Sequence, residues 1–102
     1  MIYIIATNRV KPEGREAYIK GAKEVVAETQ KEKGCVYYEN HVSINDPNLF
    51  VVVERWESRE DVDAHSRAPH LKAWREYSAP FKAGPTEIEI ITDGTVKKFT
   101  MP

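Results

Sequence analysis

Apolar and polar positions follow the period of a strand at the start of the chain and then change to the period of a helix. The segment "IYIIATNRV", Ile2 to Val10, is rich in β-branched and aromatic side chains, which predicts a strand. After the break "KPEG", helical spacing predicts a helix from Glu13 to Lys33 that ends at Gly34. Its apolar face is formed by Tyr18, Ala22, Val25 and Thr29, widened by Ile19 and Val26.

The second half repeats this order around a hairpin. Strands are predicted from Cys35 to Ile44 and from Leu49 to Glu57, because the intervening "NDPN" has the composition of a turn. Ser58, with Asp61 three residues later, resembles a capping box and predicts a helix start. Pro69 predicts a kink or a restart in this helix.

The helix continues with a stripe of spaced side chains until "AGP" ends it. The stripe is Leu71, Trp74, Ser78 and Phe81. Thr86 to Thr92 predicts a fourth strand, and "DG" predicts a turn before the segment "TVKKFTMP". The resulting βαββαβ order predicts one ferredoxin-like α+β domain over residues 1–102, with both helical regions on one face of an antiparallel sheet.

Two strands are apolar at consecutive positions, as in Ile4–Ile5 and Phe50–Val53. Successive strand residues point to opposite faces, so both faces of the sheet are apolar there. The helices cover one face only. We therefore expect a second copy to cover the other, giving a homodimer whose two sheets close into a dimeric α/β barrel; a few exposed valines on a monomer are the alternative.

Composition narrows the choice of partners. The 102 residues carry a net charge of −1 with no basic patch, which argues against nucleic acid. Apolar runs reach about five residues, far from the roughly 20 that cross a bilayer, so we expect no membrane partner.

The chain starts without a leader-like pattern, and this favours the cytoplasm. Its single cysteine, Cys35, excludes an internal disulfide and a cysteine metal cluster.

Several polar side chains lie among apolar ones. Asn8 in the first strand either contacts a substrate or is half-exposed at the strand end. Glu54 shares a face with Trp56, where a carboxyl group can have a raised pKa, although pairing with Arg55 or Arg75 is the commoner arrangement. Trp56 by itself is more often a core residue.

Two histidines flank the Pro69 break. Their mutual position depends on how the helix is interrupted, and His65 and His70 are either surface residues or proton-transfer groups. A metal site would need a third ligand, for which Glu54 or His41 could be considered, but no metal-binding spacing supports one, so we expect none.

The chain resembles a known protein family, and this resemblance implies a function. The chain resembles the antibiotic biosynthesis monooxygenase family from Ile2 to about Thr92, and is most similar to small quinol monooxygenases. One part of the likeness is Lys33 to Glu39, "KGCVYYE". The more specific part reads E-x-W-E-S and then A-H-x-x-x-P-H-x-K-A, at Glu54, Trp56, Glu57, Ser58, Ala64, His65, Pro69, His70, Lys72 and Ala73.

The resemblance implies a dimeric α/β barrel and a cofactor-independent monooxygenase acting on a small hydroquinone or phenol with O2. It implies a pocket between helices and sheet in which His65 transfers the proton and Asn8 holds the substrate oxygen. Trp56 and Tyr38 would pack against the ring, with His70 and Glu54 as further polar contacts.

Three other functions stay open at this point. Haem-degrading relatives share the "TNR"-like context of Asn8, but Arg75 stands where their iron-binding histidine would be, which disfavours haem. A group that isomerises a phosphorylated autoinducer-2 sugar shares the histidine–proline segment and Gly84–Pro85, with basic residues available for a phosphate. A barrel that binds a small ligand without catalysis is the third.

Overall fold

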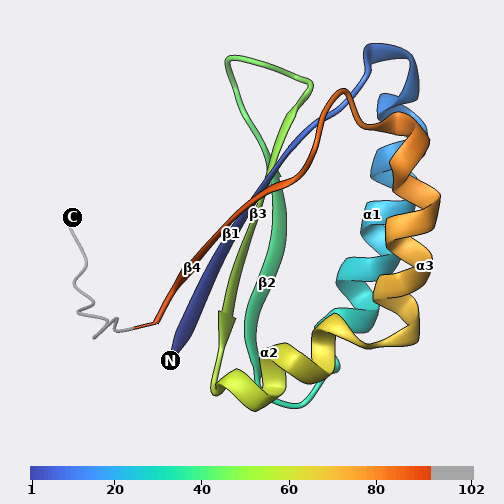
Figure 1. The fold of residues 1–102 in the computed structure, drawn as a ribbon. Helices are drawn as coiled ribbons and strands as arrows, with labels where there is room; N and C mark the ends of the chain where they lie inside the picture. The colour runs from blue at the N-terminus through green and yellow to red at the C-terminus, as the bar shows by residue number, and fades with distance from the viewer. Residues whose placement is uncertain (93–102) are drawn as a thin grey trace.

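The computed structural model describes residues 1–92 as one four-stranded antiparallel sheet with helices against it (Figure 1). The strands are β1 (Ile2–Arg9), β2 (Cys35–Val42), β3 (Leu49–Trp56) and β4 (Glu87–Ile91), in the order β2-β3-β1-β4. The helices are α1 (Arg15–Thr29), α2 (Arg59–Ser66) and α3 (Pro69–Ser78), with short 3-10 turns η1 (Pro12–Gly14) and η2 (Ala79–Phe81). The predicted ferredoxin-like α+β fold is confirmed.

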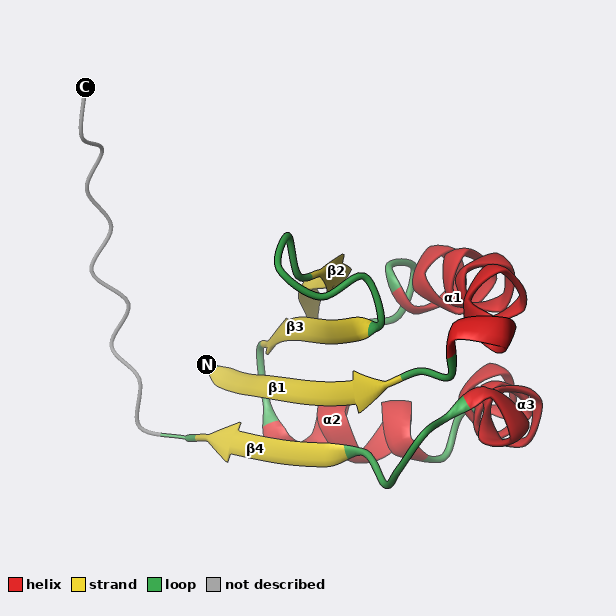
Figure 2. Cartoon of the chain, turned by 90° about the horizontal axis from the view of Figure 1, so that it is seen from above, coloured by secondary structure: helices red, strands yellow, loops and turns green. Residues whose placement is uncertain are grey.

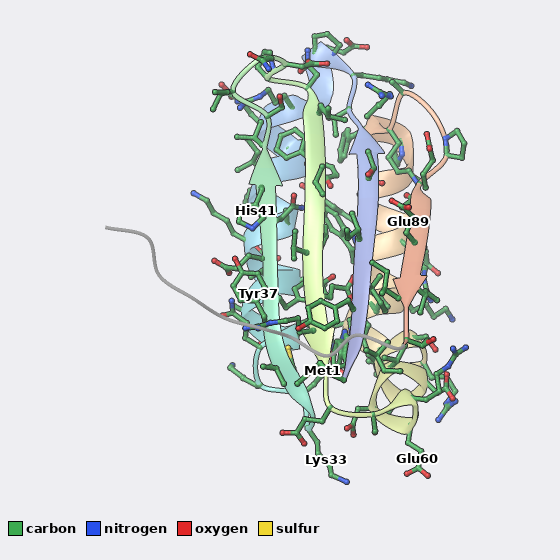
Figure 3. All side chains as sticks on the ribbon, turned by 90° about the vertical axis from the view of Figure 1, so that its left-hand side faces the viewer. Met1, Lys33, Tyr37, His41, Glu60 and Glu89 are labelled. Atoms are coloured by element: carbon green, nitrogen blue, oxygen red, sulfur yellow. The ribbon has the colours of Figure 1, made fainter. Side chains whose placement is uncertain are left out.

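All helices lie on one face of the sheet, and the other face carries none among the described residues (Figure 2). The two central strands show why. Residues alternate between fully buried and half-buried along β1 and β3, so one side chain in two faces the helices. Figure 3 looks onto the opposite face, where Tyr37, His41 and Glu89 stand toward the viewer.

The core between sheet and helices has two parts. One includes a residue of α2, and the other includes residues of α1 and is packed against side chains of α3 and the end of η2. The first consists of Ile2, Ile4, Ala6, Tyr38, Val52, Trp56 and Val62. The second consists of Val10, Tyr18, Ala22 and Phe50, with Ile19, Trp74 and Phe81 packed against it.

The first helix ends earlier than its pattern predicts. The helix α1 stops at Thr29, not at Lys33, and residues 30–34 form a turn. Gly34 does have the positive φ expected of it, +82°, but it serves the entry into β2 and not the helix C-terminus. The prediction of helix up to Lys33 is wrong because the polar segment "QKEK" has no apolar side chain to hold it against the sheet.

The break at Pro69 is a restart. Ser58 is the N-cap of α2 and accepts a hydrogen bond from the Asp61 amide at 3.2 Å, as its spacing predicts. The helix α2 ends at Ser66 and α3 begins at Pro69, which occupies the first helical position, where a missing N–H costs nothing.

The face of the sheet without helices is apolar at its centre. Its half-buried residues on the two middle strands are Tyr3, Ile5, Thr7, Leu49, Val51, Val53 and Arg55. The edge strand β4 is exposed throughout. In residues 1–92, no helix combines the length and the apolar character that crossing a bilayer demands. The predicted turn at "DG" and the segment after it lie outside the described residues.

Candidate functional site

Three polar side chains from three different elements converge at one end of the sheet. Glu32 lies in the turn after α1, His65 in the last turn of α2 and His70 in the first turn of α3. Glu32 Oε2 is 2.6 Å from His65 Nδ1 and 2.9 Å from His70 Nε2. The Pro69 restart brings the two histidines to the same carboxylate oxygen, an arrangement that a single continuous helix would not give.

Aromatic rings enclose His65 on the side of the sheet. Its imidazole centroid is 4.7 Å from the Trp56 ring and 5.5 Å from the Tyr38 ring, and Tyr38 contacts Trp56 edge-on at 6.5 Å. His65 itself is 5% exposed. The imidazole is therefore held in a dry, aromatic surrounding with its Nδ1 fixed on a carboxylate.

Two opposing effects act on the pKa of His65. Burial lowers it and is the larger effect, while the hydrogen bond and the negative charge of Glu32 raise it. The 2.6 Å contact alone would suggest an ion pair, but the pKa of His65 is lowered overall, so we assign a neutral imidazole whose Nδ1–H donates to Glu32. The Nε2 atom then carries the free lone pair and can accept a proton.

Glu54 lies on the same side of the sheet, on β3, and is buried. It accepts a hydrogen bond from Trp56 Nε1 at 2.9 Å. Burial raises the pKa of Glu54 to about 7, the Trp56 hydrogen bond opposes this, and the nearby Glu32 adds to it. The predicted pairing with Arg55 or Arg75 is not seen among the described residues: the Arg55 guanidinium lies over the Tyr37 ring and Arg75 bonds to the Ser66 carbonyl.

Tyr38 and Cys35, two further titratable groups nearby, stay protonated at neutral pH. Burial raises the pKa of the Tyr38 hydroxyl far above its ordinary value, and that of the Cys35 thiol to about 11. Neither is suited to be a base or a nucleophile at neutral pH.

Asn8 is not part of this cluster. On the sheet it pairs with Phe50, whereas Glu54 pairs with Ile4, four residues earlier on β1. That separation is about 13 Å along a strand. The Asn8 amide donates to the Tyr18 hydroxyl at 3.0 Å and accepts from the Thr86 hydroxyl, so it is tied into the second part of the core. Its predicted contact with a substrate oxygen stays a prediction.

Two grooves border the helices. The first, of about 490 Å³, runs between α1 and α3 and reaches the cluster at His70. Its other walls include Lys20, Glu28, Trp74 and Tyr77. The second, of about 430 Å³, lies between α1 and the edge strand β2. The first groove therefore gives access to His70, whose Nε2 is bonded to Glu32.

Sequence reasoning names five members of the cluster and misses Glu32. The five are Tyr38, Glu54, Trp56, His65 and His70. Glu32 lies in a polar turn that falls within the helix predicted from Glu13 to Lys33, and no spacing in "TQKEKG" relates it to the histidines 33 and 38 residues away. The signal in this segment is Gly34, two residues after Glu32, because a glycine marks a point where the chain changes direction.

This fold, with a buried histidine, two carboxyl groups and aromatic walls beneath a helix, defines a small α+β domain suited to proton transfer on a small molecule. The family model described as antibiotic biosynthesis monooxygenase matches residues 1–77, and the chain belongs to this family.

Relatives support this assignment. The Escherichia coli protein named probable quinol monooxygenase YgiN is 31% identical over 86 residues, covering 74% of this chain and 83% of YgiN. An uncharacterized Synechocystis protein, sll1783, is 30% identical over 88 residues, which cover 85% of this chain and 60% of that longer protein.

Solved structures agree in fold. A conserved protein from Methanosarcina mazei is 30% identical with a TM-score of 0.86, over 88% of this chain and 89% of that one. The Mycobacterium tuberculosis protein Rv0793 has a TM-score of 0.88 at 23% identity, over 95% and 98% of the two chains. The family resemblance seen in the sequence is thus confirmed, and membership of this family supports a monooxygenase-type function.

Proposed function

We propose that this protein is a cofactor-independent monooxygenase that inserts one atom of O2 into a small hydroquinone or phenol. The observation that carries the proposal is the buried His65, with Nδ1 held on Glu32 at 2.6 Å and its ring packed against Trp56. Membership of a monooxygenase family and the likeness to a probable quinol monooxygenase support it.

The electrons for this reaction come from the substrate. Removing a proton from a hydroquinone gives an electron-rich anion, which can pass one electron to O2 and then form a carbon–oxygen bond with the reduced oxygen. Breaking the O–O bond leaves one oxygen atom on the ring and releases the other in water, so that a hydroquinone and O2 give a hydroxyquinone and water. The protein has to remove the proton, orient the ring and keep water out.

Each task has a side chain in the cluster. His65 accepts the hydroxyl proton at Nε2, and Glu32 holds the imidazole in the required tautomer and stabilises its charged form. Trp56 and Tyr38 pack against the substrate ring. Glu54, whose pKa lies near neutrality, can exchange a proton with the intermediate, and His70 contacts a second substrate oxygen from the first groove.

The working form in this proposal is a homodimer. The helix-free face of the sheet carries half-buried apolar residues on both central strands, and a second copy stacked on it would exclude water from them. Closing the two sheets on each other makes the α/β barrel that the sequence predicts.

Oxygen consumption tests the reaction. An oxygen electrode with a panel of hydroquinones and anthrone-like phenols should record uptake by the wild-type protein. We expect the His65→Ala variant to lose about 10²–10⁴-fold in turnover, the usual contribution of a general base.

The matched control for the charge of Glu32 is an exposed glutamate on α1 that lines neither groove. Glu32→Gln should lower kcat with little change in KM, whereas Glu16→Gln should leave both unchanged, because Glu16 is exposed and lies outside the walls of both grooves. Circular dichroism verifies folding of each variant. Conversion of phosphorylated ketosugars without any oxygen uptake would replace the proposal by the isomerase, and a haem complex with an axial histidine would replace it by haem chemistry.

A further inference from the structure

We propose that Glu32, His65 and His70 form a binding site for a divalent transition-metal ion, with Zn²⁺ as the ion that fits best. Two neutral imidazoles and one carboxylate are a common ligand set for such ions, and a fourth position open to solvent completes it. The inference goes beyond the proposed oxygenase, which needs no metal.

The convergence of the three ligand atoms is the first support. Both His65 Nδ1 and His70 Nε2 are directed at the same oxygen, Glu32 Oε2, and the possible ligand atoms of the three residues all lie within 4.8 Å of one another. Ligands of a tetrahedral Zn²⁺ lie about 3.4 Å apart when the bonds are about 2.1 Å long. The present spacings of 2.6 and 2.9 Å need to widen by less than 1 Å to admit the ion.

The way the ligands are held is the second support. They come from the turn before β2, from α2 and from α3, and Glu32 is 33 and 38 residues away from the two histidines. The packing of these three segments against one another fixes the ligands. His65 is held against Trp56 and Tyr38, while the Glu32 side chain, 16% exposed, is the one that can adjust. One rigid, buried imidazole and one adjustable carboxylate allow the site to close on an ion.

Access to the site is the third support. His70 lines the groove between α1 and α3, and its side chain is 25% exposed. An ion can therefore reach the cluster without unfolding of the core, and water from the groove can occupy the fourth position.

A metal and the proposed general base exclude each other, and this consequence rests on the proposed function. An ion on His65 Nδ1 would leave Nε2 protonated, and it would also occupy the carboxylate that holds the imidazole. We therefore expect Zn²⁺ to inhibit oxygen uptake and a chelator to restore it.

Direct binding tests the site independently of turnover. We expect the purified protein to take one equivalent of Zn²⁺ from a chromophoric chelator, and Co²⁺ to give the visible absorption of a low-coordinate nitrogen and oxygen site. Glu32→Gln and His70→Ala should each weaken binding by more than the roughly 10–100-fold that loss of an outer-shell partner costs.

Two variants serve as controls. His41→Ala removes the remaining histidine, which lies on the other face of the sheet against Tyr37, and Cys35→Ser removes the one thiol. Both should bind Zn²⁺ as the wild type does. No binding at one equivalent, or binding that Glu32→Gln and His70→Ala leave unchanged, would overturn the metal site. Binding without any oxygen uptake would keep the site and reject the proposed function.

Discussion

Among the carboxyl groups of the cluster, that of Glu54 has a pKa raised to about 7, close to neutrality. It is 6% exposed, and its one described hydrogen bond, from the Trp56 indole, offsets only part of the cost of burial. Buried carboxyl groups of this kind occur where proteins move protons, because they can both give and take one near pH 7. Burying the charged form of Glu54 lowers the free energy of unfolding, and a glutamine at this position would not have this effect.

That cost depends on pH in a defined direction. The pKa of Glu54 rises from its ordinary 4.5 to about 7 on folding, so between these values the folded protein holds a proton that the unfolded chain has lost. The free energy of unfolding therefore falls as the pH rises from 4.5 to 7, by at most about 3 kcal/mol. Above pH 7 this contribution is constant.

Urea unfolding of the wild type and of Glu54→Gln at a fixed protein concentration measures this effect. The variant should gain stability relative to the wild type across that pH range, since glutamine cannot ionise. Other titrating groups, His65 among them, cancel in the difference between the two proteins. Parallel stability curves would show that Glu54 ionises in the folded protein as it does in water.

The sequence predicts those members of the candidate site that local patterns mark, and it does not predict those whose place depends on the path of the chain in space. His65 and His70 flank a proline, and Trp56 and Glu54 alternate on a strand, so local patterns drew attention to all four. Asn8 was grouped with them because the sequence does not give the distance between two points of a sheet. Glu32 required the path of the turn after α1, which no periodicity encodes.

The connection from α1 to β2 fixes how α2 meets the sheet. Gly34 adopts a φ of +82°, and a Cβ at this position would overlap the carboxyl group of Asp61 in α2. That carboxyl accepts from the Ser58 hydroxyl at 2.8 Å, and the Gly34 carbonyl accepts from the Glu57 amide at 2.9 Å. One glycine thus supports both the turn that carries Glu32 and the cap of the helix that carries His65.

Replacing this glycine should therefore be costly. Gly34→Ala should lower the free energy of unfolding by more than about 1–2 kcal/mol, because alanine resists positive φ and its methyl group displaces Asp61. Gly84→Ala is the matched control, since a Cβ there meets nothing within 4 Å. Thermal and urea unfolding compare the two; equal effects of both substitutions would contradict this role of Gly34.

Strands and helix starts were predictable from the sequence because local chemistry decides them. Alternating or β-branched residues mark β1 and β3, Ser58 caps α2 as its spacing indicates, and Pro69 starts α3. The end of α1 was not predictable to the residue. The last turn of the predicted helix is polar, so its local pattern does not distinguish helix from turn. The tertiary contacts of the following segment determine which of the two forms.

Within residues 1–92, helices cover one face of the sheet and none lies on the other (Figure 3). The uncovered face holds half-buried aliphatic residues at its centre, of which Val53 pairs with Ile5 on one side and Glu39 on the other. A stable dimer buries about 1,600 Å² in total, and the face of a four-stranded sheet is the natural place for it. The proposed barrel depends on this contact.

A charge at the centre of this face should prevent the proposed dimer. Light scattering after size exclusion should give twice the chain mass for the wild type and the chain mass for Val53→Asp, because an unpaired carboxylate would be buried in the interface. Val42→Asp should leave the dimer intact, because Val42 is an exposed residue of the edge strand β2 and lines the second groove. A wild-type monomer at all concentrations would reject the barrel.

The proposed function rests on His65 and Glu32 being the groups that meet the substrate. The most direct measurement is a crystal structure of the protein soaked, without oxygen, in a hydroquinone that it consumes in air. We expect the ring beside Trp56, with one hydroxyl within hydrogen-bonding distance of His65 Nε2 and with Glu32 still bonded to Nδ1. A ring bound away from His65, for example beside Asn8 or in the groove between α1 and β2, would contradict it.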